Sequence, residues 1–398
     1  MKPKASMQIV FLALNPTDSV TQGFLPAAGQ LGASVVLFTD RPDAHAQAYA
    51  GQPSAPAAIL GCDVRDPFAV IAALSHRPRA DAVFTNSDHL QTQAALAASY
   101  LGLPGKDWTA TLRTKNKALM RRALVELDPV FSAELGPKDD PAALDGVRFP
   151  CVVKPREGVA SEDVVLAGDP EDLLEQVHDI RTRRPDQTLV VEEFLDGPLH
   201  TLETIGDASG RLHVLGGFRT QISPPPYFIE ERMDWRPVLP DPAQQSALAQ
   251  LATLGVGLGA CHTEFVLQGD RPRLIEVNYR IVGDQCDLLL AELFGAPLFE
   301  WVLLAHLGED APAPAPSRRH ARVDYIYART GGVLREAPSA VDTAGLCYRP
   351  LRPVGDTITL THTNRDYLGV LRTIGDDRAT VDAGADAFLA AHRWDVRP

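Results

Sequence analysis

The segment Leu274–Arg280 (LIEVNYR) constrains the fold of this chain more than any other part of the sequence. A β-strand sends alternate side chains to opposite faces, so Glu276, Asn278 and Arg280 are predicted to share one face. The other face is apolar and is predicted to lie against a core: Ile275, Val277 and Tyr279. A carboxylate, an amide oxygen and a guanidinium in one row suit Mg²⁺ and the phosphates of a nucleotide. The alternative is an amphipathic strand with a solvated face.

Length and composition predict an ordinary globular protein of several domains. The chain has 398 residues, of which 45% are hydrophobic and 22% charged, so two or three domains are expected. It contains no run of about twenty apolar residues, and a signal peptide is not expected from its start. A net charge of −13 argues against a nucleic-acid partner. The five scattered cysteines lack metal-type spacing, which favours reduced thiols, and we expect a cytoplasmic protein without membrane contact.

The first hundred residues predict an α/β unit. Three short apolar runs are typical of parallel strands, and Ala-rich segments such as His89–Leu101 have helical periodicity: Gln8–Leu14, Ser34–Thr39 and Asp81–Thr85. This alternation predicts a doubly wound sheet with any ligand at the carboxyl ends of its strands. Asp88 follows the third strand, where it could contact a substrate or, together with Asn86 and Ser87, cap the next helix.

The sequence pattern changes from Trp108 onwards. A strongly helical segment, Ala118–Leu127, is followed by the strand Cys151–Pro155, which places Lys154 in apolar surroundings. A buried lysine is costly unless an anion meets it. The next turn, Arg156–Asp163, contains small residues and could direct N–H groups to phosphate oxygens. The strand Leu189–Leu195 then turns polar before Asp-Gly-Pro, which predicts a hinge between two lobes at about 192–197.

The order of these segments resembles the ATP-grasp superfamily over about residues 113–295. The resemblance implies an ATP-grasp fold, α+β in its nucleotide lobes, with Lys117 and Lys154 on the nucleotide phosphates and Ser161 in the phosphate loop. It implies that the hinge strand contacts adenine through Glu192, Glu193, Phe194 and Leu195. It implies that Mg²⁺, or Mn²⁺, is held by Glu264, Glu276 and Asn278. Arg280 would steady the reacting phosphate and carboxylate.

The finer resemblance is to carboxylate–amine ligases of the L-amino-acid ligase group. The segments HTEF and RLIEVNYRIVGD are similar to that group's paired metal segments, and 216–231 resembles its substrate lid, with Glu230 as the lid acid. Two departures stand out. Leu199 occupies the place of a ribose-binding glutamate, so either Glu192 or Glu193 takes over or ribose binding is looser. The lid continues as Arg232–Trp235 (RMDW) instead of glycine–histidine.

The resemblance implies an enzyme that joins small carboxylate and amine substrates through an acyl phosphate, with release of ADP and phosphate. Arg280 and Lys154 would be catalytic, and further substrate contacts are expected at Glu230, Gly283, Asp284 and Asp88. His262 is either the base for the amine or a hydrogen-bonded core histidine. The alternatives are a purine-pathway or carboxylase-type enzyme, or a non-catalytic nucleotide-binding module. We expect domains at 1–107, 108–310 and 311–398, the last β-rich, an extended linker at 311–316, and possibly a homodimer.

Overall fold

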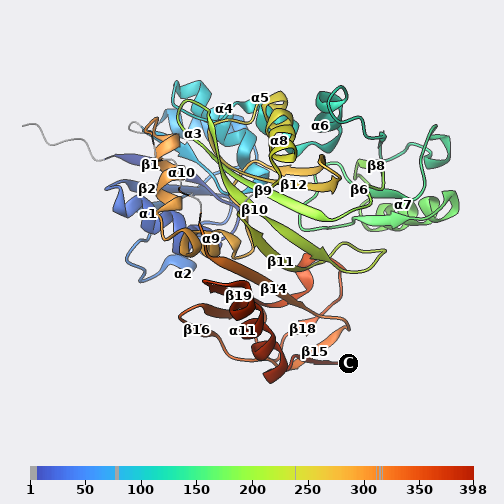
Figure 1. The fold of residues 1–398 in the computed structure, drawn as a ribbon. Helices are drawn as coiled ribbons and strands as arrows, with labels where there is room; N and C mark the ends of the chain where they lie inside the picture. The colour runs from blue at the N-terminus through green and yellow to red at the C-terminus, as the bar shows by residue number, and fades with distance from the viewer. Residues whose placement is uncertain (1–6, 77–79, 238, 311, 313–314, 316) are drawn as a thin grey trace, which may run out of the picture.

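The computed structural model describes residues 7–76, 80–237, 239–310, 312, 315 and 317–398. The chain begins with a parallel sheet in the order β3-β2-β1-β4 (Figure 1). Its strands are β1 (Gln8–Leu12), β2 (Ser34–Thr39), β3 (Ala58–Gly61) and β4 (Ala82–Phe84). Both faces of this sheet are buried, which is why its strands are apolar throughout. The predicted α/β unit is confirmed, although β1 ends two residues before the predicted Leu14.

Helices cover the two faces of this sheet. They are the π-helical turn η1 (Ser19–Phe24), α1 (Leu25–Gln30), α2 (Pro42–Tyr49), α3 (Pro67–Ser75), the 3₁₀ turn η2 (Asp88–Leu90) and α4 (Gln91–Leu101). Alternate residues of β1 belong to different cores, since Ile9 and Phe11 pack in one and Val10 and Leu12 in the other. This two-sided packing leaves the carboxyl edge of the sheet open to ligands.

Two helices lead into a small antiparallel lobe. Asp107 caps α5 (Trp108–Lys115) and Asn116 caps α6 (Lys117–Leu124). The lobe has the strand order β5-β8-β6-β7, with bounds Ser132–Leu135, Leu189–Glu193, Cys151–Pro155 and Val165–Ala167. It also contains the 3₁₀ turn η3 (Pro141–Ala143), and α7 (Pro170–Arg183) packs on the sheet. The predicted helix end at Leu127 was wrong, because the chain turns after Leu124 to bring Asp128 into a buried ion pair with Arg273.

A nine-stranded antiparallel sheet forms the centre of the molecule, in the order β13-β12-β9-β10-β11-β14-β19-β17-β16. Its first five strands are β13 (Arg271–Asn278), β12 (Gly259–Gln268), β9 (Leu199–Gly206), β10 (Leu212–Ile222) and β11 (Glu230–Arg236), and α8 (Asp241–Leu254) packs beside β13. The expected lid at 216–231 is therefore only partly a loop. Gly216–Ile222 belongs to β10, because its ladder with β9 continues to Thr220 and its ladder with β11 to Ile222, and the loop spans 223–229.

A bulge in β13 corrects the predicted alternation of the LIEVNYR segment. Glu264 pairs with Glu276, whereas the next residue of β12, Phe265, pairs with Leu274, so Ile275 is the extra residue. An inserted residue shifts the two-residue period by one. Leu274 and Val277 consequently pack in the core, whereas Ile275 lines a cleft beside Glu276.

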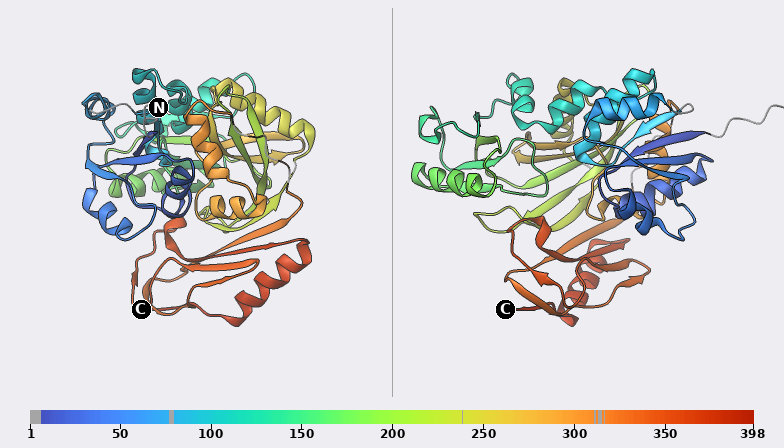
Figure 2. Two further views of the ribbon diagram at one scale, coloured as in Figure 1. Left: turned by 90° about the vertical axis from the view of Figure 1, so that its left-hand side faces the viewer. Right: turned by 180° about the vertical axis from the view of Figure 1, so that it is seen from behind.

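The C-terminal residues extend the same sheet and then build a separate layer (Figure 2). The extension consists of β14 (His320–Tyr327), β19 (Tyr367–Gly375), β17 (Leu346–Pro350) and β16 (Val341–Thr343). A three-stranded sheet of β18 (Thr357–Ile358), β15 (Gly332–Glu336) and β20 (Asp395–Arg397) lies beside it, with the 3₁₀ turn η4 (Asn364–Asp366) and α11 (Arg378–Ala391). The three domain limits stay predictions, and most of the expected 311–316 linker lies outside the described residues.

Two buried helices connect the central sheet to the first domain. They are α9 (Cys286–Phe294) and α10 (Leu298–His306), and both contribute to the largest core. In the described part of the chain, no single helix is long and apolar enough to cross a membrane. Helices α9 and α10 reach that length and apolar composition only when taken together, and they are bent by 104° at the break between them.

Candidate functional site

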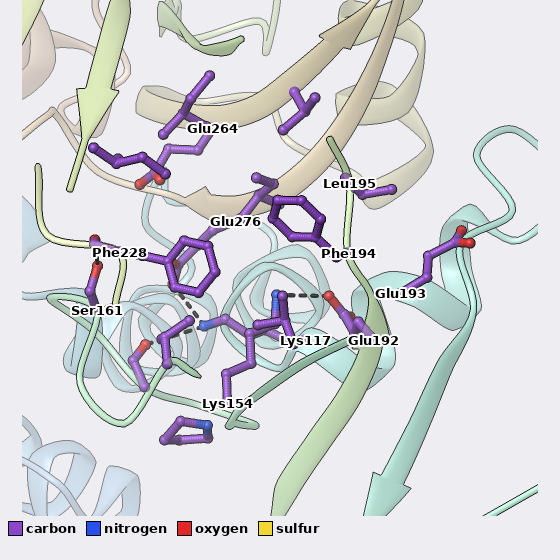
Figure 3. A pocket seen from close by; sticks show the side chains of 18 of the residues that line it. Lys117, Lys154, Ser161, Glu192, Glu193, Phe194, Leu195, Phe228, Glu264 and Glu276 are labelled. Carbon is purple, nitrogen blue, oxygen red and sulfur yellow. Dashed lines mark hydrogen bonds and ion pairs between the residues drawn. The ribbon is translucent and has the colours of Figure 1, made fainter. Parts of the chain in front are cut away.

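A largely apolar cleft, here called the nucleotide cleft, opens between the small lobe and the central sheet. β6 and β8 form one wall, and β12 and β13 form the other. Its apolar lining consists of Val152, Val164, Phe194, Leu195, Leu199, Ile222, Phe228, Val266 and Ile275. The rings of Phe194 and Phe228 lie 6.4 Å apart on two sides of the cleft (Figure 3). Flat apolar walls of this kind suit a planar base.

One end of the nucleotide cleft carries paired charges. Lys117 Nζ lies 2.9 Å from Glu276 Oε1 and donates a second hydrogen bond to the carbonyl oxygen of Gly158 at 3.3 Å. Lys117 is the first residue of α6, and its own N–H donates to the carbonyl of Arg156 at 3.0 Å. The helix start and the loop 156–163 are therefore fixed to each other. The predicted phosphate lysine and the predicted metal acid meet in this structure.

The second predicted lysine belongs to a buried group of three charges. Lys154 Nζ lies 2.7 Å from Glu192 Oε2, and Arg121 donates to both oxygens of Glu192 at 2.8 and 3.0 Å. Although burial opposes ionisation, Arg121 and Lys154 hold the pKa of Glu192 well below its usual range. Two cations on one carboxylate leave a net positive charge that faces the cleft. Sequence reasoning missed Arg121 as a site residue, although it lies one helical turn after Lys117 and so on the same helix face.

The four predicted adenine contacts of the hinge strand line the cleft, and the carboxylates of Glu192 and Glu193 already form ion pairs with other residues. The carboxylate of Glu193 accepts from Arg148 at 3.2 Å and lies 3.4 Å from Arg273. The N–H groups of Glu193 and Phe194 donate to the carbonyls of Phe131 and Pro150. Neither Glu192 nor Glu193 therefore has an unengaged carboxylate for the ribose hydroxyls. Leu199 lines the cleft at the place of the missing ribose acid, and a ribose contact by Glu192 or Glu193 stays a prediction.

The loop 156–163 closes over the cleft in a strained conformation. Ala160, Ser161 and Asp163 have φ values of 56°, 54° and 54°, a left-handed region that residues other than glycine rarely adopt. Ser161 Oγ donates to the carbonyl of Phe228 at 2.8 Å, which ties this loop to the 223–229 loop (Figure 3). Strain at this position is typical of a segment whose geometry serves a ligand.

The three predicted metal ligands converge where β12 and β13 pair. Glu264 and Glu276 are direct cross-strand partners, and Asn278 Nδ2 lies 3.4 Å from Glu264 Oε1. Among the described residues, no group of three or more His, Cys, Asp or Glu side chains could enclose a metal by itself. Two carboxylates and an amide oxygen nevertheless form the hard donor set that Mg²⁺ prefers when phosphates and water complete its shell. The residues therefore fit a nucleotide-bound Mg²⁺.

His262 is buried between two carboxylates. Its Nδ1 lies 2.7 Å from Glu203 Oε1 and its Nε2 lies 3.3 Å from Glu264 Oε1. Burial acts against the charge, but Glu203 and Glu264 raise the pKa of His262 to about 10. An imidazolium that is protonated on both nitrogens cannot act as the base for an amine near neutral pH. Of the two readings of His262, the hydrogen-bonded buried histidine is the one that agrees with the structure, and Glu203 is a second residue that the sequence did not single out.

Beyond the metal end, a polar cavity of about 350 Å³ opens along the carboxyl edge of the first sheet. Three parts of the chain line it: the loops after β1 and β4, the turn after β13, and β19 with its neighbours. Its polar lining is Asn15, Thr17, Asp18, Ser19, Asn86, Ser87, His89, Arg280, Asp284 and Gln285. Arg280, Gly283 and Asp284 also line a smaller space that contains Glu230, Glu264 and Glu276. These three shared residues join the polar cavity to the nucleotide cleft.

The turn after β13 is the second strained segment. Asp284 and Gln285 have φ values of 51° and 72°, and the carbonyl oxygens of these two residues accept from Tyr325 and Arg372, both at 3.4 Å. Arg280 donates to the carbonyl of Ile281 at 2.9 Å. The predicted substrate residues Arg280, Gly283 and Asp284 therefore do lie together, on a turn that tertiary contacts hold.

Asp88 does not cap the following helix, and its contact with a substrate stays a prediction. It forms an ion pair with Lys115, and its side chain does not cap the following helix. Burial raises its pKa, but the charges of Lys115 and then Arg280 outweigh that effect and lower it. The turn is held by other groups, because Gln91 donates to the carbonyl of Thr85 at 3.1 Å. Asp88 thus contributes a negative charge near Arg280, and the helix-capping alternative was wrong.

Glu230 begins β11 and lines both the nucleotide cleft and the smaller space beside Arg280. Burial, followed by the charges of Glu264 and Asp284, raises the pKa of Glu230 to about 8. Its Oε2 accepts a hydrogen bond of 3.3 Å from Asn364. Asn364 belongs to the C-terminal β-rich region, to which the sequence gave no chemical role.

Comparisons with known proteins agree with this geometry. Residues 147–288 match the family model of the ATP-grasp domain. Protein y4rH of Sinorhizobium fredii (strain NBRC 101917 / NGR234), described as uncharacterized, is 24% identical over 312 residues, which are 74% of this chain and 64% of that protein. The chain thus aligns with less than two thirds of the length of that relative.

Two solved structures share the architecture over nearly the whole chain. The L-amino acid ligase from Bacillus licheniformis has a TM-score of 0.81 at 21% identity, covering 99% of this chain and 100% of that one. The biotin carboxylase domain of the Hydrogenobacter thermophilus 2-oxoglutarate carboxylase, solved with MgADP and bicarbonate, has a TM-score of 0.72 at 16% identity, covering 99% and 92%. The predicted fold is therefore confirmed: the chain contains an ATP-grasp domain within an ATP-grasp architecture.

Proposed function

We propose that this chain, which contains an ATP-grasp domain, is an ATP-dependent ligase that joins a small carboxylic acid to an amine. The acid is activated as an acyl phosphate, and ADP and phosphate are released. One observation carries the proposal: Lys117, Glu276 and Arg280, with Lys154 and Glu264, converge where the apolar nucleotide cleft meets the polar cavity. ATP and an acid bound on the two sides would meet at that junction.

The nucleotide cleft supports ATP in one orientation. The adenine would lie between the apolar walls near Phe194 and Phe228, with the hinge residues Glu193 and Leu195 at its edge. The phosphates would then extend toward Lys154 and Lys117. On binding, Lys117 would exchange its contact with Glu276 for a phosphate oxygen, which releases that carboxylate for the metal.

Phosphoryl transfer requires alignment and charge neutralisation more than covalent help. Glu264, Glu276 and Asn278 would hold Mg²⁺, which when bound neutralises phosphate charge and aligns the γ-phosphoryl group. Lys117, Lys154 and Arg280 supply further positive charge from the protein. The net positive charge of the Arg121–Glu192–Lys154 group would persist when phosphates arrive, because both cations share one carboxylate.

The acid and the amine would occupy the junction and the polar cavity. Arg280 would bind the substrate carboxylate while an oxygen of that carboxylate attacks the γ-phosphorus of ATP. The amine nitrogen would then attack the acyl carbon of the acyl phosphate as phosphate leaves. The carboxyl groups of Glu230 and Asp284 and the nearby charge of Asp88 lie around this position, which favours an ammonium group on one of the substrates. We infer a small amino-acid-like acid or a precursor of a siderophore or other secondary metabolite. Closure of the loop 156–163 would exclude water from the acyl phosphate.

The test is release of ADP and phosphate with ATP, Mg²⁺ and pools of small carboxylic acids and amines. We expect both products only when an acid and an amine are present together. Formation of AMP and pyrophosphate would contradict the proposal. The same assay with bicarbonate tests the chemistry implied by the biotin carboxylase likeness, and ADP binding without turnover on any pool would indicate a non-catalytic nucleotide-binding module.

A further inference from the structure

We propose that Asn364 is a positioning residue, which orients the carboxylate of Glu230 toward the junction between the nucleotide cleft and the polar cavity. This inference rests on the proposed function, in which Glu230 meets the ammonium group of a substrate. It assigns a role in the site to the C-terminal β-rich region. Asn364 lies 134 positions from Glu230 in the chain, so neither residue predicts the other from sequence.

Asn364 forms hydrogen bonds with both the backbone N–H and the side-chain carboxylate of Glu230. The N–H of Glu230 donates to Asn364 Oδ1 at 3.1 Å, and Asn364 Nδ2 donates to Glu230 Oε2 at 3.3 Å. Asn364 also lines the same space as Arg280 and Glu264. One amide side chain therefore fixes the backbone and the carboxylate of a single site residue, which leaves that carboxylate little rotational freedom.

A rigid turn presents Asn364. The buried carboxylate of Asp366 accepts hydrogen bonds from the N–H of Thr361 at 2.9 Å, from the hydroxyl of Thr361 at 2.8 Å and from the N–H of His362 at 2.7 Å. Thr363 Oγ1 accepts from the N–H of Arg365 at 3.1 Å. A fully bonded turn of this kind holds the amide in place at low entropic cost when a ligand binds.

The same turn contacts both loops over the nucleotide cleft. The N–H of Asn364 donates to the carbonyl of Ala160 in the strained loop at 3.2 Å. The ring of His362 stacks on Tyr227 in the 223–229 loop, with centroids 4.2 Å apart. Arg365 lies 3.4 Å from Glu162. The turn that holds Glu230 therefore also contacts the two loops that would close on ATP.

A neutral donor is the suitable partner for Glu230. The acids Glu264, Glu276 and Asp284 surround it, and His262 is the one facing cation among the groups that shift its pKa. A lysine or arginine in place of Asn364 would orient the carboxylate but also neutralise it. An amide orients it and leaves its charge available to a substrate ammonium group.

The first experiment tests the contact without any activity assay. Asn364→Asp keeps the acceptor for the N–H of Glu230 but replaces the Nδ2 donor with an oxygen that repels its carboxylate. A double-mutant cycle combines this substitution with Glu230→Gln and measures stability by urea unfolding at pH 8. The effect of Asn364→Asp on the unfolding equilibrium constant should differ at least fivefold between the wild-type and the Glu230→Gln backgrounds. The Gln amide can donate to the new carboxylate, so Asn364→Asp should cost much less in that background. Additive effects would overturn the contact, whatever the protein catalyses.

The second experiment tests the role in the reaction once a substrate pair is found. We expect Asn364→Asp to lower kcat/KM for the ammonium-bearing substrate at least tenfold, with KM for ATP changed less than twofold. Arg365→Ala is the matched control, because Arg365 lies in the same turn and its side chain forms an ion pair with Glu162 of the loop 156–163. Equal losses in both variants, or a loss confined to KM for ATP, would show that the turn only supports the fold and would overturn the positioning role. Absence of turnover in the wild-type chain would instead contradict the proposed function.

Discussion

The nucleotide cleft and the polar cavity are built in opposite ways. In the nucleotide cleft every central charge has a partner within the domain: Lys117 with Glu276, and Arg121 and Lys154 with Glu192. At the junction between the nucleotide cleft and the polar cavity, Glu230 lies among other acids and is held by a neutral amide. The charges of the cleft have partners of opposite sign before any ligand binds and keep a net positive charge, whereas burial and neighbouring acids oppose the ionisation of Glu230 at the junction.

This difference shows how binding and selectivity can be separated in one molecule. A common ligand such as ATP can be met by groups that also stabilise the empty protein. A particular acid or amine is better selected by groups that are unfavourable in the empty site and become favourable only when the correct substrate binds, because other ligands do not provide that stabilisation.

The largest expected effect is on Glu276, at the meeting point of the two regions. Glu276→Gln should lower turnover roughly a thousandfold, about 4 kcal/mol in the barrier, because a metal ligand is lost. ADP release measures the loss, and circular dichroism should show an intact fold. Glu175→Gln, on the exposed face of α7, is the matched control with no expected effect. Near-normal turnover of Glu276→Gln would refute the metal role.

The next effect concerns stability in the nucleotide cleft. Glu192→Gln leaves Arg121 and Lys154 buried without a counter-charge, and should lower the free energy of unfolding by about 3 kcal/mol. Urea unfolding at pH 7 measures the change. A loss below about 1 kcal/mol would mean that the buried group is not electrostatically satisfied, and the contrast between the two regions would fail.

The same substitution in the other region should have the opposite sign. The folded state raises the pKa of Glu230 from 4.5 to about 8, so this group costs no stability below pH 4.5 and a growing amount as pH rises toward 8. Glu230→Gln removes that cost. Because the side chain is only half-buried and cavity water screens it, we expect a gain of about 1 kcal/mol at pH 8 and none at pH 4. Urea unfolding at both pH values checks this, and a loss at pH 8 would contradict it.

The smallest effect is expected at the mouth of the polar cavity. Arg349 of β17 lies 2.6 Å from Asp18 of the first domain, and both side chains are partly exposed. Arg349→Ala should lower stability by about 0.5 kcal/mol and change KM for the cavity substrate by roughly threefold, with KM for ATP unchanged. The exposed Arg335→Ala serves as the control. A larger change in KM for ATP would show that the two regions are not separable.

Much of the nucleotide cleft could be predicted because its residues occur in short, ordered segments of one domain. Lys117, Lys154, Glu264, Glu276 and Asn278 were all named from the sequence, and they do converge. Arg121 was missed because a helical arginine usually faces solvent, and only the position of Glu192 makes it a site residue. Ile275 was assigned to the wrong face because a single bulge reverses the strand period, and bulges leave no reliable trace in sequence.

Strand period, helix period and residue type by themselves predicted the first α/β unit and the polar face of the segment 274–280, because they act over neighbouring residues. The ATP-grasp fold and the nucleotide end of the site followed from the resemblance of the ordered motifs to that superfamily. Only the tertiary structure decided which charges are paired, that His262 is a cation between two acids, and that Asn364 reaches Glu230 from the C-terminal region. Most of those facts depend on contacts between residues far apart in the sequence, such as Asn364 with Glu230 and Lys117 with Glu276, and such contacts are set by how the sheets and domains pack. The polar cavity is lined by three parts of the chain, which is why its residues could be named singly but not assembled from sequence.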